Sequence, residues 1–373
     1  YKMKYLNIII KLFLYLYSRI TLNLLILTII IGFIFNLYLI YFSFFLLFLK
    51  IFSKKKNFFY LIVSYIFLGF FLFDLYSKQD FTKSDYKTIS NIEYEINQYF
   101  GYQPKKNSIL KEKVYFKEKL IHEFNYSINK FGHRETLNKY NNLEKCVIFH
   151  GGSITFGQSV NDDETLPYYI SKKLNDKYSV FNFAFNGYGP HQFLSKIENN
   201  YFEEVKNCKK VFIVYQFIND HVGRTAGRRS WGDKAPRYLI KDGKIYQKGF
   251  FSNYPYKLIM KFRKNMRNSK LISIFYNVEN VNKKDVEIFL KILRKIEFLS
   301  KKIFNESEFI YLIWNEEKKK YNKIYNFFYN NKNININKID ISNKIKKNNI
   351  PGDNHPTGEF NFIISRELFK LIN

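Results

Sequence analysis

Cysteine is scarce in this sequence. Only Cys146 and Cys208 occur in 373 residues, and they match neither a disulfide framework nor a metal-binding pattern. Paired spacing typical of a metal site is also lacking among five of the six histidines, namely His122, His133, His150, His191 and His221. We therefore expect no metal and two separately buried thiols, although the cysteines would pair if their strands were neighbours in an oxidising compartment.

Acidic residues are also few: 32 Asp and Glu stand against 60 Lys and Arg, a net charge of +28. Such a charge often indicates a nucleic-acid partner. Here the excess is mostly lysine, mixed with Asn, Ile, Tyr and Phe along the whole chain, and no recognisable nucleic-acid module accompanies it. We interpret the charge as a compositional bias and expect no nucleic acid, with anionic lipid or acidic polysaccharide as the alternative partner.

Long apolar runs are confined to the first 75 residues, where residues 20–52 and 58–73 are separated by Lys54, Lys55 and Lys56. Because a spanning helix needs about 20 apolar residues, we predict a transmembrane anchor over 1–75. No small-residue cleavage site follows, which favours an uncleaved anchor over a signal peptide. The alternative is a buried helical hairpin. The sequence begins with Tyr1 rather than Met, so residues can precede it.

The lysine triplet is predicted to face the cytoplasm, which would place everything after Asp74 outside. The basic amino-terminal end favours the cytoplasm too, and two spans cannot put both there. Residues 76–143 are polar but contain aromatic pieces, so we expect an extension that packs on the next domain rather than a free linker. Within it, His133 and Arg134 could reach a site, but we interpret them as residues that satisfy local backbone and leave them out of it.

From Glu144 onward, strands and helices alternate. Strands are predicted at 147–149, 179–183, 211–216, 309–314 and 336–341. Helices are predicted at 164–174, 191–199, 285–303, 316–329 and 357–371. Strands separated by helices indicate a parallel sheet covered on both faces, which is a doubly wound, three-layer α/β/α fold.

Four short polar blocks each follow a strand and so fall on one edge of that sheet. They are Gly151-Gly152-Ser153, Asn186-Gly187-Tyr188-Gly189, Phe217-Ile218-Asn219-Asp220, and the loop from Pro351 to Pro356. Acyl transfer requires a nucleophile, a base, a group that orients the base, and donors for an oxyanion, and these blocks contain all of them. By itself Ser153 is better explained as a helix N-cap or a turn serine, and the other three blocks reverse that preference.

These blocks, together with the segment from Tyr126 to Arg134, resemble the SGNH (GDSL-type) hydrolase family, in particular its membrane-anchored bacterial members. The resemblance covers residues 144–373 and implies a flavodoxin-like sheet, a serine mechanism and no cofactor. It implies that Ser153 is the nucleophile, His355 the general base, and Asp353 its orienting carboxylate. It also implies that the oxyanion hole is formed by the amides of Ser153 and Gly187 and the side chain of Asn219.

Three positions depart from the family pattern. The usual Gly-Asp-Ser is Gly-Gly-Ser here, Phe217 replaces a common glycine, and the usual Asp-x-x-His is shortened to Asp353-x-His355. The last departure puts the role of Asp353 in more doubt than those of Ser153 and His355. An insertion at 222–284 includes a hairpin signal around Asp242-Gly243, and we expect it to form a lid, with a plain surface loop as the alternative.

The expected function is a membrane-anchored serine esterase that hydrolyses O-acyl groups, in particular acetyl, on a small molecule or an envelope glycan. The expected location is the bacterial cytoplasmic membrane, with residues 144–373 on its outer side. One alternative is an O-acyltransferase that uses the same residues and passes the acyl group to a polysaccharide hydroxyl. The other is a non-catalytic glycan-binding or assembly protein that retains the fold.

Overall fold

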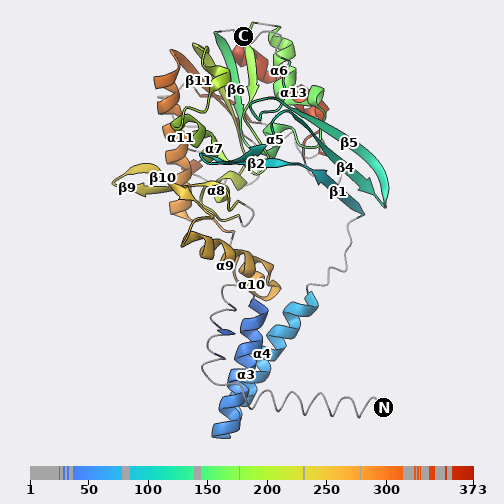
Figure 1. Cartoon of the computed structure of the whole chain (residues 1–373), viewed down its shortest axis with the longest axis vertical. Helices are drawn as coiled ribbons and strands as arrows, with labels where there is room; N and C mark the ends of the chain where they lie inside the picture. Colours follow the sequence, from blue (N-terminus) through green and yellow to red (C-terminus); the bar gives the residue numbers. More distant parts are fainter. Residues whose placement is uncertain are drawn as a thin grey trace. The chain divides into compact units, whose positions relative to one another are not determined.

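The computed structural model describes residues 37–77, 85–137, 144–175, 177–229, 232–277, 279–313, 336–340, 349–350 and 355–373, with single positions at 25, 28, 29, 32, 323, 324, 326 and 328. The chain divides into two compact units (Figure 1). One comprises Tyr1–Lys83 and Tyr254–Glu279, and the other Ser84–Asn253 and Asn280–Asn373.

The first unit contains two long apolar helices, α3 (Leu37–Lys55) and α4 (Phe58–Ser77), which pack against each other as a hairpin. Phe44 of α3 stacks on Phe67 of α4 with ring centroids 4.9 Å apart. By length and composition, Phe58–Tyr76 could cross a membrane: its mean hydropathy is 2.1 and only 11% of it is buried. Within the first predicted run, 20–52, residues 37–52 belong to α3, and residues 20–36 lie mostly outside the described residues.

The second unit is built on five parallel strands: β6 (Lys145–His150), β7 (Ser179–Asn182), β8 (Lys210–Phe217), β11 (Glu306–Ile313) and β12 (Ile336–Asp340). Their order across the sheet is β12-β11-β8-β6-β7. In chain order this is 2-1-3-4-5, the flavodoxin-like arrangement, and it confirms the predicted fold class. The predicted helix at 316–329 lies mostly outside the described residues.

Helices cover both faces of this sheet, because alternate strand residues are apolar on both sides. Helices α6 (Leu166–Leu174) and α13 (Gly358–Ile372) pack on one face against Val147 and Phe149. Helices α7 (Pro190–Glu198) and α11 (Lys283–Ile303) pack on the other against Ile148. Such burial on both faces is typical of parallel sheets.

The extension forms more sheet than the sequence indicated. Its strands are β1 (Tyr86–Asn91), β2 (Tyr94–Asn97), β3 (Gly101–Pro104), β4 (Ser108–Phe116) and β5 (Lys119–Ile128). Strands β1, β4 and β5 form one antiparallel sheet and β2 and β3 a second. They bury Phe100, Val114 and Tyr126 in one cluster with Phe156 and Phe185 of the α/β domain. The extension is therefore part of this unit's core.

The insertion is divided between the two units. After α8 (Asp220–Thr225), strands β9 (Pro236–Lys241) and β10 (Lys244–Phe250) form the hairpin that Asp242-Gly243 indicated, with positive φ angles of 50° and 72° at the turn. Helices α9 (Tyr256–Asn268) and α10 (Lys270–Phe275) follow, and they belong to the unit that contains α3 and α4.

Cys146 and Cys208 form a disulfide with their Cα atoms 5.8 Å apart, so the expectation of two separate thiols was wrong. The cause is strand order. Strands β6 and β8 are neighbours, with Cys146 opposite Val211, which places the residues just before β8 beside the start of β6. Disulfides persist in oxidising compartments, so this pairing bears on where the domain is located.

The buried carboxyl of Glu297, in α11, should make the stability of the fold depend on pH. Glu297 is 4% exposed, its carboxyl accepts a hydrogen bond from the Tyr311 hydroxyl, and burial raises its pKa to about 7. A raised folded-state pKa contributes stability below the unfolded pKa of about 4.3 that is lost as pH rises through 7. We expect Glu297→Gln to gain roughly 1–3 kcal/mol at pH 8 and little at pH 4.5, measured by thermal unfolding across that range. An equal gain at both pH values would contradict it.

Candidate active site

Ser153 lies on a tight turn at the end of β6. Gly151 has φ = 154°, and a Cβ there would collide with the Thr155 hydroxyl, so the position requires glycine. Ser153 then begins the short helix α5 (Ser153–Phe156). The strand thus ends abruptly, and the serine comes at its carboxyl end.

His355 meets Ser153 across 202 residues of sequence: its Nε2 is 2.8 Å from the Ser153 Oγ. The histidine precedes α13, and its carbonyl accepts a hydrogen bond of 2.8 Å from the Ile350 amide, which fixes the loop at this point. Asp353 lies outside the described residues, so its predicted role stays a prediction. The described geometry therefore provides a hydroxyl and an imidazole in hydrogen-bond contact.

The predicted oxyanion donors come from the loops after β7 and β8. Gly187 has φ = 79°, and its turn is held by a hydrogen bond of 2.9 Å from the Tyr102 hydroxyl to the Asn186 carbonyl. Asn219 follows β8 and is half-buried. Strands β6 and β8 flank the point where strand order reverses, which is where open α/β sheets bind ligands. Ser153 and Asn219 follow these two strands.

A cavity of about 460 Å³ opens at Ser153 and Gly187. The extension contributes Tyr94 and Tyr102 to its wall, so residues 76–143 help to form the site. The remaining wall residues are Ile92, Gln158, Phe185, Asn186, Arg224, Asp233 and Lys234. Aromatic faces beside groups that donate and accept hydrogen bonds can hold a polar substrate with hydroxyl groups.

Arg224 connects the loops that carry the predicted donors. Its Nη1 donates to the Tyr188 carbonyl at 2.6 Å, and its Nε donates to Asp220, the neighbour of Asn219, at 2.7 Å. Burial acts to raise the pKa of Asp220, but Arg224 and Arg229 outweigh it and the pKa is lowered. The carboxylate therefore stays charged, and one guanidinium links the second and third blocks.

Arg224 and His221 also leave little space for a side chain at Gly152, the position where the resemblance led us to expect an aspartate. A Cβ on Gly152 would lie 2.5 Å from Arg224 Nη1, 3.0 Å from His221 Nε2 and 3.1 Å from the Tyr188 carbonyl oxygen. The space for a side chain is thus already filled. His221 is 1% exposed, its Nδ1 is 2.7 Å from the Tyr215 hydroxyl, and burial holds its pKa well below the ordinary value. It remains neutral beneath the site.

For the acyl transfer that the sequence predicts, we expect Arg224→Met to lower kcat by roughly 10- to 100-fold, because hydrogen bonds made by a charged group each contribute about 1.5–3 kcal/mol. The effect on KM should be smaller, since Arg224 holds the two loops in position. Arg224→Lys should not rescue it, since one ammonium cannot reproduce the planar fork. The matched control is Arg228→Met. Arg228 forms a comparable ion pair with Asp285 at 2.9 Å but bonds neither loop. Unchanged kcat in Arg224→Met would contradict the positioning role.

Arg134 is the site residue that the sequence interpretation missed. It is 1% exposed, and its Nη1 donates to the carbonyls of Phe156 and Gly157, at 3.0 Å to the first. Its Nη2 donates to Val160 at 2.8 Å, and its Nε to Asp162 at 2.8 Å. These groups lie in and just after the helix that begins at Ser153. The signal in the sequence was the Tyr126–Arg134 resemblance, where we noted that Arg134 could reach a site but assigned it to local backbone.

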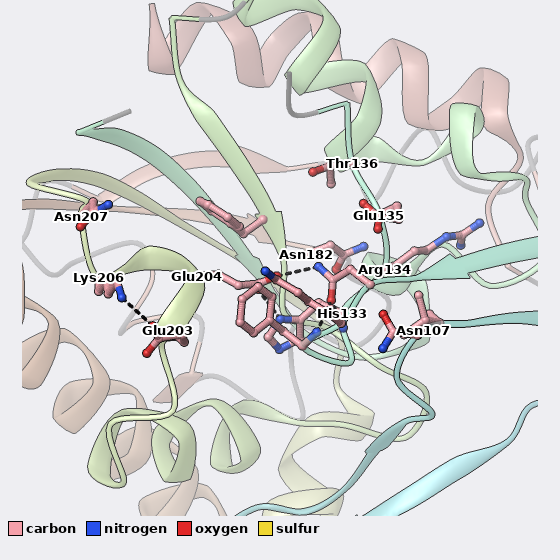
Figure 2. A pocket seen from close by; sticks show the side chains of 15 residues that line it. Asn107, His133, Arg134, Glu135, Thr136, Asn182, Glu203, Glu204, Lys206 and Asn207 are labelled. Atoms are coloured by element: carbon pink, nitrogen blue, oxygen red, sulfur yellow. Dashed lines mark hydrogen bonds and ion pairs between the residues drawn. The ribbon is translucent and has the colours of Figure 1, made fainter. Parts of the chain in front are cut away.

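A second cavity, of about 590 Å³, is lined by neither Ser153 nor His355 (Figure 2). Here the His133 Nδ1 pairs with Glu204, and its Nε2 is 2.8 Å from the buried Lys196 ammonium, whose pKa burial lowers to about 7. Asn129 also donates to Glu204, at 2.6 Å. These polar groups satisfy one another's hydrogen-bonding needs. The bonds also link the extension to α7 and to the 3-10 turn Glu203–Val205.

No protein-family model and no curated protein sequence matches the chain. Among solved structures it is similar to a member of the lipolytic protein G-D-S-L family from Veillonella parvula (11% identity, 61% of this chain, 97% of that chain, TM-score 0.34). It is also similar to an acetyl xylan esterase from Butyrivibrio proteoclasticus (10% identity, 78% of this chain, 84% of that chain, TM-score 0.38). A psychrotrophic esterase from Pseudoalteromonas sp. matches at 11% identity over 61% of this chain and 95% of that chain, with TM-score 0.34.

Proposed function

We propose that this chain is a membrane-anchored serine hydrolase of the SGNH (GDSL) type that cleaves O-acyl esters. The observation that carries the proposal is the 2.8 Å contact between the Ser153 hydroxyl and the His355 imidazole. Both lie at the carboxyl edge of a parallel sheet, beside a cavity that is open to a ligand. Identities of 10–14% do not transfer an activity, so the proposal rests on this chain's own side chains.

In the proposed mechanism His355 accepts the Ser153 proton while the oxygen attacks the ester carbonyl carbon. The carbonyl electron pair moves to oxygen, where the amides of Ser153 and Gly187 and the Asn219 side chain donate hydrogen bonds. His355 then returns the proton to the leaving alcohol, and a serine ester remains. Water attacks that ester with the same assistance, which releases the acid and restores Ser153.

The substrate class is proposed from the cavity. Tyr94 and Tyr102 offer aromatic faces, and Asp233 and Lys234 offer an acceptor and a donor, which suits the hydroxyls of an acylated glycan. Lys234 already lies over the Tyr94 ring at 4.3 Å and donates to its hydroxyl at 2.7 Å. A cavity of about 460 Å³ accommodates a few sugar rings with a short acyl group such as acetyl.

The proposed location is the outer side of a bacterial cytoplasmic membrane. The apolar span Phe58–Tyr76 supports an anchor, and the Cys146–Cys208 disulfide supports an oxidising compartment for the domain. The lysine triplet Lys54–Lys56 lies just before the start of α4, whereas the domain follows its end. The triplet would therefore face the cytoplasm.

The test is to incubate the full chain in detergent with 4-nitrophenyl acetate and with an O-acetylated glycan, with and without an added sugar alcohol. Hydrolysis predicts free acetate from both substrates, in amounts that the alcohol hardly changes. Transfer of most acetyl groups to the alcohol would instead identify the O-acyltransferase. Glycan binding without acetate release would identify a non-catalytic protein and overturn the proposal.

A further inference from the structure

The segment between β10 and α11 leaves the α/β domain and joins the unit of α3 and α4. Its two helices, α9 and α10, pack against each other, and α10 packs on α4 (Figure 1). Nothing in the proposed ester chemistry requires these helices. Their place in the fold indicates a role of their own, and the lid expected over 222–284 stays a prediction.

A buried carboxylate fixes α10 at the end of α4. Asp74, in the last turn of α4, is 1% exposed and accepts hydrogen bonds from the Ser269 hydroxyl at 2.6 Å and the Leu271 amide at 2.8 Å. Ser269 in turn caps α10 by accepting from the Ile272 amide at 3.1 Å. The start of α10 is therefore held at the end of α4 opposite Lys54–Lys56.

The surface of this segment combines positive charge with apolar side chains. Residues 254–276 contain no Asp or Glu and six cationic side chains: Lys257, Lys261, Arg263, Lys264, Arg267 and Lys270. Phe275 is 83% exposed, the highest value among large apolar residues in the described part of the chain, and Ile274 is 64% exposed. Exposure of such apolar side chains to water is unfavourable. The surface therefore indicates a partner that offers both negative charge and an apolar contact.

The pattern along α9 is that of a helix at a membrane surface. At 100° per residue, Leu258, Ile259 and Phe262 fall on one side of the helix, and Lys257 and Lys264 fall on the opposite side. Interfacial helices have an apolar face that enters the acyl boundary and basic residues that attract anionic headgroups. Helix α9 packs on α10, and α10 packs on α4, the helix that is long and apolar enough to cross a bilayer.

We propose that α9 and α10 form a second membrane attachment, which binds anionic phospholipid headgroups on the side where α4 ends, next to Asp74. The proposal rests on the membrane anchoring in the proposed function but not on the ester chemistry. Six cations, of which Arg267 pairs with Glu279 at 3.4 Å, give this segment a net positive charge that matches an anionic surface, and Ile274 and Phe275 supply the apolar contact. The attachment ties the insertion, and through it the α/β domain, to the bilayer.

The test is hydrogen–deuterium exchange of the full chain in nanodiscs of phosphatidylcholine alone or with one-third phosphatidylglycerol. Because each cation near an anionic surface contributes about 1 kcal/mol, we expect exchange in 256–275 to be roughly tenfold slower with the anionic lipid, and the difference to shrink at high salt. A variant with Lys257→Glu, Lys264→Glu and Lys270→Glu should lose the difference. The matched control replaces the exposed lysines Lys87, Lys119 and Lys172 of the other unit by Glu.

Equal exchange in both nanodiscs, or an anionic-lipid effect that survives the triple substitution, would overturn the proposal. Protection that depends on protein concentration rather than on lipid would overturn it in favour of a second copy of the chain. Failure of the anchor itself is seen separately, as protein that does not enter nanodiscs at all. Unchanged exchange in β6 and β8 verifies that each variant is folded.

Discussion

Ser153→Ala is expected to lower kcat for ester hydrolysis by at least about 10³-fold, because the hydroxyl 2.8 Å from His355 is the only proposed nucleophile. His355→Ala should cost a similar factor. The two residues act as one unit, so the double variant should lose little more than either single variant. Initial rates with 4-nitrophenyl acetate, at saturating substrate, measure all three.

A serine-reactive phosphonate gives an independent readout of the same assignment. The wild-type chain should gain one phosphonate, located at Ser153 by peptide mass spectrometry, and Ser153→Ala should gain none. The matched control is Ser90→Ala, in the exposed part of β1, which should react as the wild type does. Labelling that persists in Ser153→Ala would place the nucleophile elsewhere.

Arg134→Met is expected to reduce stability by about 3–5 kcal/mol and to lower kcat as well. The substitution leaves the Asp162 carboxylate without its cation and removes the donors to Phe156, Gly157 and Val160. The guanidinium also lies over the rings of Tyr126 and Phe156, at 4.5 and 5.1 Å from their centroids. Thermal unfolding and kcat per phosphonate-reactive site measure the two effects separately.

Two further variants make the Arg134 prediction specific. Arg134→Lys keeps the charge but can reach fewer carbonyls, so it should fall between wild type and Arg134→Met in both measurements. Arg366→Met, on the exposed side of α13, removes an arginine that the solvent surrounds and should leave both unchanged. Wild-type stability in Arg134→Met would show that the turn after Ser153 does not depend on it.

The parallel sheet could be predicted closely from sequence, because strands buried on both faces are continuous apolar runs that end in turn residues. The runs at 147–149 and 211–216 correspond to β6 and β8 with one or two residues added at each end. The loops after them could be placed on one edge because parallel strands share a direction. The Ser153–His355 contact follows from that rule.

The extension could not be predicted equally well, because its strands are antiparallel and partly exposed. Strands β4 and β5 turn at Lys117-Glu118, where both residues have positive φ angles of 45° and 66°. Turns of this kind usually contain Gly or Asn, so the usual hairpin signal was missing. The contacts of Arg134 were hidden for a related reason, since they form only when the extension packs on the nucleophile turn.

The insertion shows another limit of local patterns. The Asp242-Gly243 hairpin was found because its turn chemistry is explicit, whereas α9 and α10 were missed. Their apolar residues face the neighbouring helices and solvent rather than the α/β core, so they do not extend its alternation of strands and helices. The pairing of Cys146 with Cys208 likewise depended on strand order, which neither segment specifies alone.

The insertion is divided between the two units, and this affects whether a single proteolytic cut could release the α/β domain. The chain passes between the two units three times, at residues 83–84, 253–254 and 279–280. A protease that cuts only between Ser77 and Asp85 would leave the domain joined covalently to α9 and α10, which the buried Asp74 carboxylate holds on α4. For the membrane-anchored enzyme proposed above, release after such a cut would also require this contact to dissociate, so the clipped domain would stay attached for as long as Asp74 keeps its partners.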